Sequence, residues 1–312
     1  MGGFPRAAET GLAYDTERKS PAGRKPWDEI VIFKALVLQA LYNLSDDQIE
    51  YQIRDRLSFM RFLGLGVEDR VPDAKTVWLY RETLAQAGMV EALFDVFDGH
   101  LKSQGYLAMG GQIVDASIVS APRQRNSRDE NNAIKEGNPP ADWKPKKKAQ
   151  KDVDARWTKK HGKSYFGYKN HVGIDRRHKL VRRYAVTDAA VHDSQKLDDL
   201  LDPENTASDV WADSAYRSQE TEEKLAERGL RSRIHRKANR GKLLSQRAQE
   251  ANRTRSKVRA RVEHVFGHQH TSMAGKIVRT IGIGRAKAKI GLTNLVYNMS
   301  RFVFLERARG TA

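Results

Sequence analysis

The hydrophobic pattern of the 312-residue chain changes its period once, near Gly105. Before that point, apolar residues recur close to the helical period of about 3.6, as in residues 30–41. After it, short runs of β-branched and aromatic residues alternate with helical stretches, beginning with residues 112–119. We therefore expect a block of helices followed by a domain that mixes strands and helices.

The helical block is expected to bind DNA. Residues 1–25 hold Gly, Pro and charge with little periodicity, which is typical of a flexible N-terminus. Residues 26–105 predict five helices, and one pair resembles a helix-turn-helix in which Asp73 is the N-cap of the second helix. Lys75 and Thr76 then lie near the start of the recognition helix and contact DNA. A plain helical bundle without a DNA role is the alternative.

The remaining residues, 106–312, predict a catalytic domain of the α/β class. Their elements follow the order strand, hairpin pair, helix, strand, helix, strand, helix, which predicts a mixed sheet. This order matches the ribonuclease-H-like fold, in which the first and fourth strands lie side by side at the centre of the sheet. A long polar segment, residues 122–163, predicts a basic loop that is partly disordered without a partner.

Three acidic residues are candidates for one site. Asp115 lies inside an apolar strand, where a carboxylate is costly unless it has a purpose. Asp213 ends the fourth strand and Glu263 lies on a later basic helix, so the fold can bring all three together. Converging carboxylates repel one another without a metal, whereas Mg²⁺ ions between them support phosphodiester chemistry. Taken singly, each acid has a simpler explanation as a cap, a turn former or a solvated ion pair.

The charge of the chain indicates a polyanionic partner. The net charge is +17, and residues 231–261 hold 12 Lys or Arg against one acid, Glu250. Nucleic acid is the expected partner, with a ribosomal or membrane-surface protein as the alternative.

The absence of cysteine excludes disulfides and thiolate metal sites. No signal peptide and no apolar run of bilayer length is present, so a soluble cytoplasmic protein without a membrane partner is expected.

Four fragments together resemble the DDE transposases of bacterial insertion sequences, in the type-five family within the type-four and type-five group. They are QIVDASIVSAPRQ, GYKNHVGIDRRHKLVRRYAVTDAAVHDSQ, VWADSAYRS and RARVEHVFGHQH. The resemblance covers nearly the whole chain. It implies Asp115, Asp213 and Glu263 as a catalytic triad that binds divalent metal, expected as two Mg²⁺ or Mn²⁺ ions. It also implies element ends, usually terminal inverted repeats, and target DNA as substrates.

Residues around the second and third acids are further DNA-binding candidates. The broader group has a Tyr, Arg, Glu, Lys pattern around the third acid, and Arg259 stands at its Arg position. Ser256 and His270 stand at the Tyr and Lys positions. These departures leave open whether cleavage of the second DNA strand passes through a DNA hairpin intermediate. Arg259 is expected to bind a phosphate or to orient a catalytic acid, with a solvated arginine as the alternative. The other expected DNA contacts are Tyr216, Arg217, Arg261 and His270.

These observations predict a transposase that binds inverted repeats and catalyses metal-dependent strand cleavage and strand transfer. We expect at least a homodimer on DNA, in the bacterial cytoplasm and associated with the nucleoid. One alternative is a ribonuclease-H-like nuclease without strand transfer. The other is a catalytically inert DNA-binding protein derived from a transposase.

Overall fold

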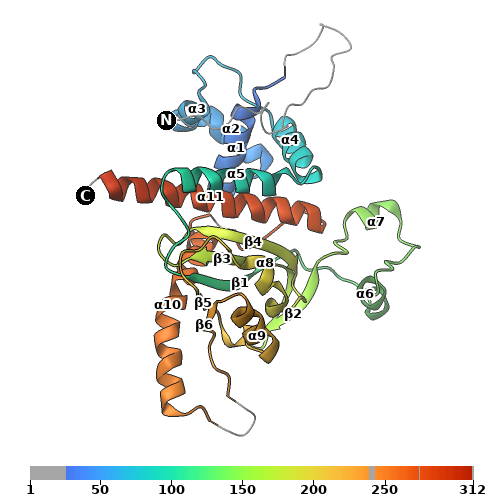
Figure 1. Ribbon diagram of the computed structural model, residues 1–312. Helices are drawn as coiled ribbons and strands as arrows, with labels where there is room; N and C mark the ends of the chain where they lie inside the picture. The colour runs from blue at the N-terminus through green and yellow to red at the C-terminus, as the bar shows by residue number, and fades with distance from the viewer. Residues whose placement is uncertain (1–25, 239–242, 274, 311–312) are drawn as a thin grey trace. The chain divides into compact units, whose positions relative to one another are not determined.

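The computed structural model describes residues 26–238, 243–273 and 275–310 (Figure 1). The predicted flexible N-terminus, residues 1–25, lies outside these residues. The chain divides into two compact units, Met1–Ala87 and Gly88–Ala312. Within the described residues, none of the helices combines the length and the apolar character needed to cross a lipid bilayer.

The described part of the first unit is helical. Helix α4 begins at the predicted cap, because the Asp73 carboxylate accepts a hydrogen bond from the Thr76 backbone N–H at 2.7 Å. Arg81 of α4 forms a bidentate ion pair with Asp46 at the start of α2, with N···O distances of 2.5 and 2.8 Å. This pair ties α4 to α2. The helices are α1 (Glu29–Tyr42), α2 (Asp46–Asp55), α3 (Leu57–Leu63) and α4 (Ala74–Gln86).

The fifth helix, α5 (Met89–Ser103), belongs to the second compact unit. Its apolar side packs on α11 (Ile283–Gly310) and β4 (Val181–Asp188), with the rings of Phe94 and Tyr184 4.8 Å apart. The sequence pattern marks α5 as a helix but does not indicate which side of the boundary it packs on.

The second unit is built on a six-stranded mixed sheet with the predicted ribonuclease-H-like strand order. The central strand β1 (Gln112–Ser120) pairs antiparallel with β3 (Lys163–Asp175) and parallel with β5 (Asp209–Trp211). Strand β3 also pairs antiparallel with β4 and with β2 (Arg156–Lys160), and β5 pairs parallel with β6 (Arg231–Ser232). The predicted fold class is thereby confirmed.

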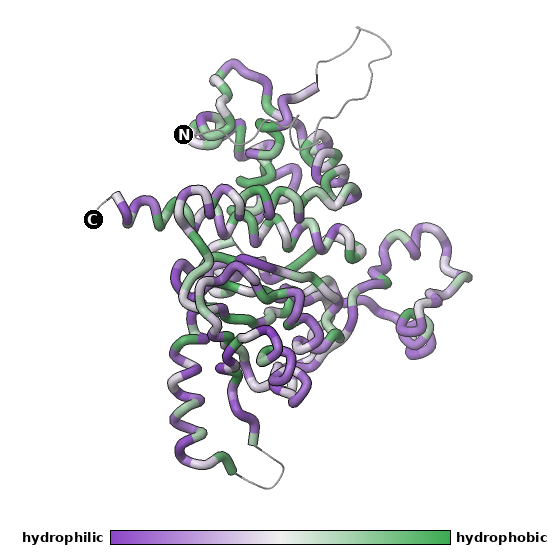
Figure 2. The backbone as a smooth tube through the Cα atoms, viewed as in Figure 1, coloured by the Kyte–Doolittle hydropathy of each residue, from purple (hydrophilic) through white to green (hydrophobic). Residues whose placement is uncertain are grey.

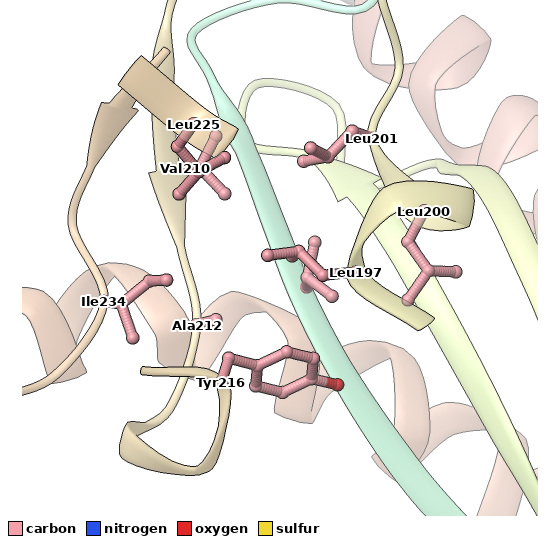
Figure 3. Packing of buried hydrophobic residues seen from close by; sticks show 9 residues of the cluster. Leu197, Leu200, Leu201, Val210, Ala212, Tyr216, Leu225 and Ile234 are labelled. Atoms are coloured by element: carbon pink, nitrogen blue, oxygen red, sulfur yellow. The ribbon is translucent and has the colours of Figure 1, made fainter. Parts of the chain in front are cut away.

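Helices cover both faces of this sheet (Figure 1). Val114 of β1 packs in a buried cluster with residues of α8 (Leu197–Leu200) and α9 (Gln219–Glu227), shown in Figure 3. Val119 of the same strand packs in another cluster with residues of β4 and α11. Because side chains alternate across a strand, these two valines mark opposite faces. The helix α10 (Gln246–Thr271) contacts β1 and α11.

The segment 122–163, predicted as a basic loop, contains short elements of secondary structure. It contains α6 (Arg128–Lys135), α7 (Pro145–Ala149) and the strand β2. A capping box between Ser127 and Glu130 starts α6. The Glu130 carboxylate also accepts a hydrogen bond from the Trp143 indole at 2.8 Å and pairs with Lys147 at 2.6 Å. A single buried tryptophan and a shared acid hold this segment together, which a composition argument does not detect.

Helix α10 has two halves with different surroundings. The second half carries the buried residues Val262, Val265 and Phe266 against the sheet. Between Ala248 and Val262 no side chain is buried, and the first half extends away from the sheet (Figure 1). Figure 2 shows mainly hydrophilic residues along this outer half. It carries much of the basic run identified in the sequence.

Gly173 of β3 is required by close packing. A Cβ atom at this position would lie 2.1 Å from the backbone oxygen of Leu200. Gly173→Ala is therefore expected to lower the free energy of unfolding by about 2 kcal/mol, because strand or helix must shift. Gly99→Ala is the matched control. A Cβ there meets nothing within 4 Å, and alanine favours the helix by roughly 0.5–1 kcal/mol. Urea unfolding measures both, and equal stabilities for the two variants would contradict the packing argument.

Candidate functional site

Asp115 and Asp213 lie next to each other at one edge of the sheet. The last paired residues of β1 and β5 are Ile113 and Trp211, and each aspartate follows two positions later. Because β1 and β5 are parallel neighbours, Asp115, in the middle of β1, lies beside Asp213, just beyond the carboxyl end of β5. That edge is where open α/β sheets usually bind ligands. The Asp213 charge also raises the pKa of Asp115, as expected for two nearby carboxylates.

The Asp115 carboxylate is largely buried and fully hydrogen-bonded. One oxygen accepts the Ala116 backbone N–H at 2.8 Å, and the other accepts the Arg259 guanidinium at 2.5 Å. Burial raises the pKa of Asp115 to about 6, although Arg259 acts in the opposite direction. Loss of hydration therefore outweighs the ion pair. The charged form of Asp115 depends on its arginine partner.

Asp213 also uses one carboxylate oxygen to accept a backbone hydrogen bond. Its carboxylate accepts the Ala215 N–H at 2.6 Å and caps the short 3₁₀ turn η3 (Ser214–Tyr216). The simple explanation of this residue as a cap is thus correct for one oxygen. The cap fixes the side chain at the strand end, so it does not exclude a functional role for the carboxylate.

Arg259 lies between Asp115 and Glu263. One terminal nitrogen contacts Asp115, and the other contacts Glu263, one helical turn later, at 3.2 Å. The Nε atom is buried and has no hydrogen-bond partner among the described residues. The Glu263 side chain is 62% exposed, against 14% for Asp115. Of the two predicted roles of Arg259, the structure contains the ion pair with an acid.

The donor atoms at this edge suit a divalent cation. Across residues 26–238, 243–273 and 275–310, no three His, Cys, Asp or Glu side chains gather closely enough to hold a metal ion. Arg259 fills the space between Asp115 and Glu263. Mg²⁺, however, is usually held by one or two carboxylates, with water and phosphate oxygens completing its shell. The hard oxygens of Asp115 and Asp213 meet that requirement.

Two predicted DNA contacts near Asp213 have other partners. Tyr216 is 0% exposed and packs in the cluster with Val114, so its ring offers no surface to DNA (Figure 3). The pattern after Asp213 does not distinguish a buried from an exposed ring. Arg217 donates a hydrogen bond to the Ile234 carbonyl at 3.1 Å and pairs with Glu222 at 3.2 Å. It braces the chain beyond β6 and remains partly exposed.

Two predicted contacts on α10 lie away from the acids. The His270 ring forms a 3.1 Å hydrogen bond with Ser117 of β1 and stacks on Phe266, so it fixes α10 on the sheet. Arg261 is half-buried; burial lowers the pKa of Lys179, and the charges of Arg301 and Arg261 act in the same direction.

The remaining predicted contacts belong to the first unit. Lys75 is exposed at the start of α4. Thr76 is half-buried, and its backbone N–H is occupied by the Asp73 cap. The acids of the candidate site belong to the second unit. DNA contact by Lys75 and Thr76 therefore stays a separate prediction.

His235 is a residue of this edge that the sequence analysis missed. It follows β6, the next parallel strand, and its ring lies 3.4 Å from the Ser256 hydroxyl of α10. Burial lowers the pKa of His235, and the Arg259 charge acts in the same direction while Asp213 opposes it. A histidine at the end of the last strand segment, residues 231–235, is the signal that identifies this position.

Burial of Asp115 is expected to make stability fall as the pH rises. Its pKa in the folded protein, about 6, lies above the ordinary value of 3.8. Between these values the folded state holds the proton more tightly than the unfolded chain does. Relative to Asp115→Asn, the wild-type free energy of unfolding should fall by on the order of 2–3 kcal/mol from about pH 4 to about pH 6. Urea unfolding of both proteins in EDTA across this range measures the difference, and a difference that is constant or grows with pH would refute it.

Known proteins resemble both parts of the chain. The family described as "Transposase DDE domain" matches residues 107–299. The family described as "Transposase domain (DUF772)" matches residues 10–83. The crystal structure of the Mos1 strand transfer complex is 11% identical, with 88% of this chain and 85% of that chain covered, at a TM-score of 0.21. A likeness at so low a score carries no argument about this chain.

The first match contains β1, β5 and the part of α10 that carries Arg259 and Glu263. It therefore includes the whole acidic edge of the sheet, and the second match ends within α4. Since the first match spans more than half of the 312 residues, the chain belongs to the transposase DDE domain family.

Proposed function

We propose that this transposase cuts a DNA strand at an element end and joins the released 3′ hydroxyl to target DNA. The observation that carries the proposal is the proximity of Asp115 and Asp213 on neighbouring parallel strands, beside a basic helix, in a chain of this family. Element ends are expected to be inverted repeats. The family type proposed from the sequence fragments is the type-five family of insertion sequences.

Asp115 and Asp213 are the proposed ligands of a divalent cation, with Glu263 as a third. Mg²⁺ or Mn²⁺, expected as two ions, would activate the attacking water or hydroxyl and stabilise the charge that develops on phosphorus. The backbone N–H groups of Ala116 and Ala215 each hold one aspartate oxygen, so both carboxylates keep a fixed orientation. Preorganised ligands reduce the ordering that accompanies binding.

Arg259 has a proposed second role toward DNA. It forms ion pairs with both Asp115 and Glu263. A cation bound to these acids would take over that task, and the guanidinium would then be available to a phosphate oxygen. Nearby, the outer half of α10 offers exposed basic residues that suit the phosphate backbone: Arg247, Arg253 and Lys257.

The first unit is proposed to recognise the element end. Lys75 is exposed in the first turn of α4, which suits the phosphate or base contacts of a recognition helix. Thr76 lies beside it. Transposition joins two ends to one target, so at least a homodimer on DNA is proposed. The sequence-based expectation of a bacterial, nucleoid-associated protein belongs with this proposal.

Strand transfer separates this proposal from its rivals. The assay combines pre-cut duplexes that end in the inverted repeats flanking the gene, a target plasmid and MgCl₂. Joined products are the expected result. Cleavage of uncut ends without joining would favour a ribonuclease-H-like nuclease, and binding without either reaction would favour an inert DNA-binding protein.

Asp213→Asn is expected to keep DNA binding and to lose at least about a hundredfold in cleavage rate. Loss of a cation ligand removes several kcal/mol of transition-state stabilisation, whereas phosphate contacts elsewhere persist. Asp209→Asn, at the other end of β5, is the matched control, because Asp209 pairs with Arg233 and not with the acidic edge. Gel shift and cleavage assays measure both variants. Cleavage by Asp213→Asn at the wild-type rate would refute the site.

Lys75→Ala is expected to weaken binding to the element end and to reduce the slope of log K against log salt by about 1. Each phosphate contact releases about one counterion, so removal of one contact lowers the slope by that amount. Lys224→Ala is the matched control, because Lys224 already pairs with Glu220 at 2.7 Å. Fluorescence anisotropy at several salt concentrations measures the slopes. Equal slopes for Lys75→Ala and the wild type would show that Lys75 does not contact a DNA phosphate.

A further inference from the structure

A basic pocket lies between the chain that follows β6 and the start of α10. Its volume is about 340 Å³. Among the described residues that line it, none is acidic and three are cationic: Arg217, Arg236 and Lys237. The other lining residues are apolar apart from Ser245, the N-cap of α10. A pocket of this composition suits a ligand that carries phosphate.

Two arginines converge on one carbonyl oxygen at this place. Arg217 and Arg255 each donate a hydrogen bond to the Ile234 carbonyl, at 3.1 and 3.0 Å, so their guanidinium groups lie close together. Burial lowers the pKa of Arg255, and the charge of Arg236 acts in the same direction. Glu222 opposes these charges through its 3.2 Å ion pair with Arg217. The remaining excess of positive charge is unfavourable in the free protein and would be relieved by an anion.

The basic pocket adjoins the acidic edge of the sheet. The His235 backbone N–H donates a hydrogen bond to the Ala212 carbonyl at 3.2 Å, so His235 neighbours the residue before Asp213. Arg236 follows directly in the chain, and Arg217 is the C-cap of η3, the turn that Asp213 begins. A DNA strand whose cleaved phosphate lies at Asp213 would therefore place a neighbouring phosphate at this pocket.

Arg236 and Lys237 present exposed side chains on a fixed backbone. Neither side chain has a hydrogen-bond or ion-pair partner among the described residues. The Arg236 N–H donates to the Asn252 side chain at 2.9 Å, and the Arg236 carbonyl accepts from the same side chain at 3.0 Å. These two bonds tie the segment to α10, beside which it runs in Figure 1. The two cations are thus held in place without an acid of their own.

We propose that the basic pocket binds the phosphate backbone of DNA next to the cleaved phosphate, with Arg217, Arg236 and Lys237 as its cationic contacts. The inference rests on the proposed function, because the acidic edge sets where the strand lies. Guanidinium and ammonium groups bind phosphate oxygens through charge and N–H donors. The chain between β6 and α10 then belongs to the DNA interface.

The test compares two double variants of the full-length protein. Arg236→Ala/Lys237→Ala, the pocket variant, removes both exposed cations and keeps the backbone hydrogen bonds that hold the segment on α10. Its melting temperature should stay within about 2 °C of the wild type. Lys224→Ala/Arg228→Ala is the control variant, because it removes the same charge from side chains that already pair with Asp198.

The first measurement is the affinity for a pre-cut element-end duplex, by fluorescence anisotropy at several salt concentrations. The pocket variant should lower the slope of log K against log salt by about 1 to 2, one for each phosphate that loses its cation. The control variant should keep the wild-type slope. A wild-type slope in the pocket variant, or an equal reduction in both variants, would overturn the proposal.

Ethylation interference shows which phosphate the pocket contacts. An ethyl group removes the charge of a phosphate, so ethylation next to the cleavage point should weaken binding by the wild type. The same modification should not weaken binding by the pocket variant further, because the contact is already lost. Equal interference in both proteins would show that the pocket does not contact this part of the strand.

A free nucleotide carries the same phosphate chemistry, and dATP distinguishes it from a DNA strand. Calorimetry should show that dATP binds the wild type at least about a hundredfold more weakly than the duplex, because the duplex makes many further contacts. Tighter binding of dATP than of the duplex, lost in the pocket variant, would assign the pocket to a free nucleotide and overturn the proposal.

Asp213→Asn distinguishes failure of this inference from failure of the proposed function. If Asp213→Asn loses cleavage while the pocket variant keeps the wild-type slope, only the basic pocket is wrong. If the pocket variant lowers the slope and Asp213→Asn cleaves at the wild-type rate, the pocket still contacts DNA, but the proposed cleavage site is wrong.

Discussion

The ion pair between Asp115 and Arg259 is the contact on which the arrangement of the site depends. A carboxylate in the middle of a central strand loses its hydration, and here burial outweighs the opposing charge of its partner. The partner comes from α10, so satisfying Asp115 also fixes where that helix crosses the sheet. The Ser117–His270 hydrogen bond adds a second attachment further along both elements. These two polar contacts thus fix the position of α10 on β1.

Both aspartates have a structural role that leaves room for the proposed chemical one. Each gives one oxygen to a neighbouring backbone N–H and keeps the other for a partner beyond the backbone. Arg259 pairs with two acids, Asp115 and Glu263, while its buried Nε atom has no hydrogen-bond partner among the described residues. Such local departures from full hydrogen bonding are expected where a fold gives up some stability for function.

The sequence predicted what depends on local pattern and strand order. The Asp73 cap and the helices α1–α5 follow from capping residues and from hydrophobic period, and the pairing of β1 with β5 follows from the order of the elements. It did not predict contacts made at long range. The burial of Tyr216, the Ser117 partner of His270 and the place of His235 each depend on elements distant in the chain. Trp143 shows the same limit, because its hydrogen bond to Glu130 joins residues 13 positions apart in a segment that the composition predicts as a loop.

The two halves of α10 should differ in how readily they open. The inner half is anchored by Val262, Val265 and Phe266, whereas the outer half buries no side chain between Ala248 and Val262. Its attachments to the rest of the unit include the paired hydrogen bonds between Asn252 and the Arg236 backbone. Amide hydrogen exchange should therefore be fast in the outer turns and slow in the inner turns of one continuous helix. A rigid anchor next to the acids and a pliable outer end would let the same helix hold fixed geometry at one end and adapt to a curved polyanion at the other.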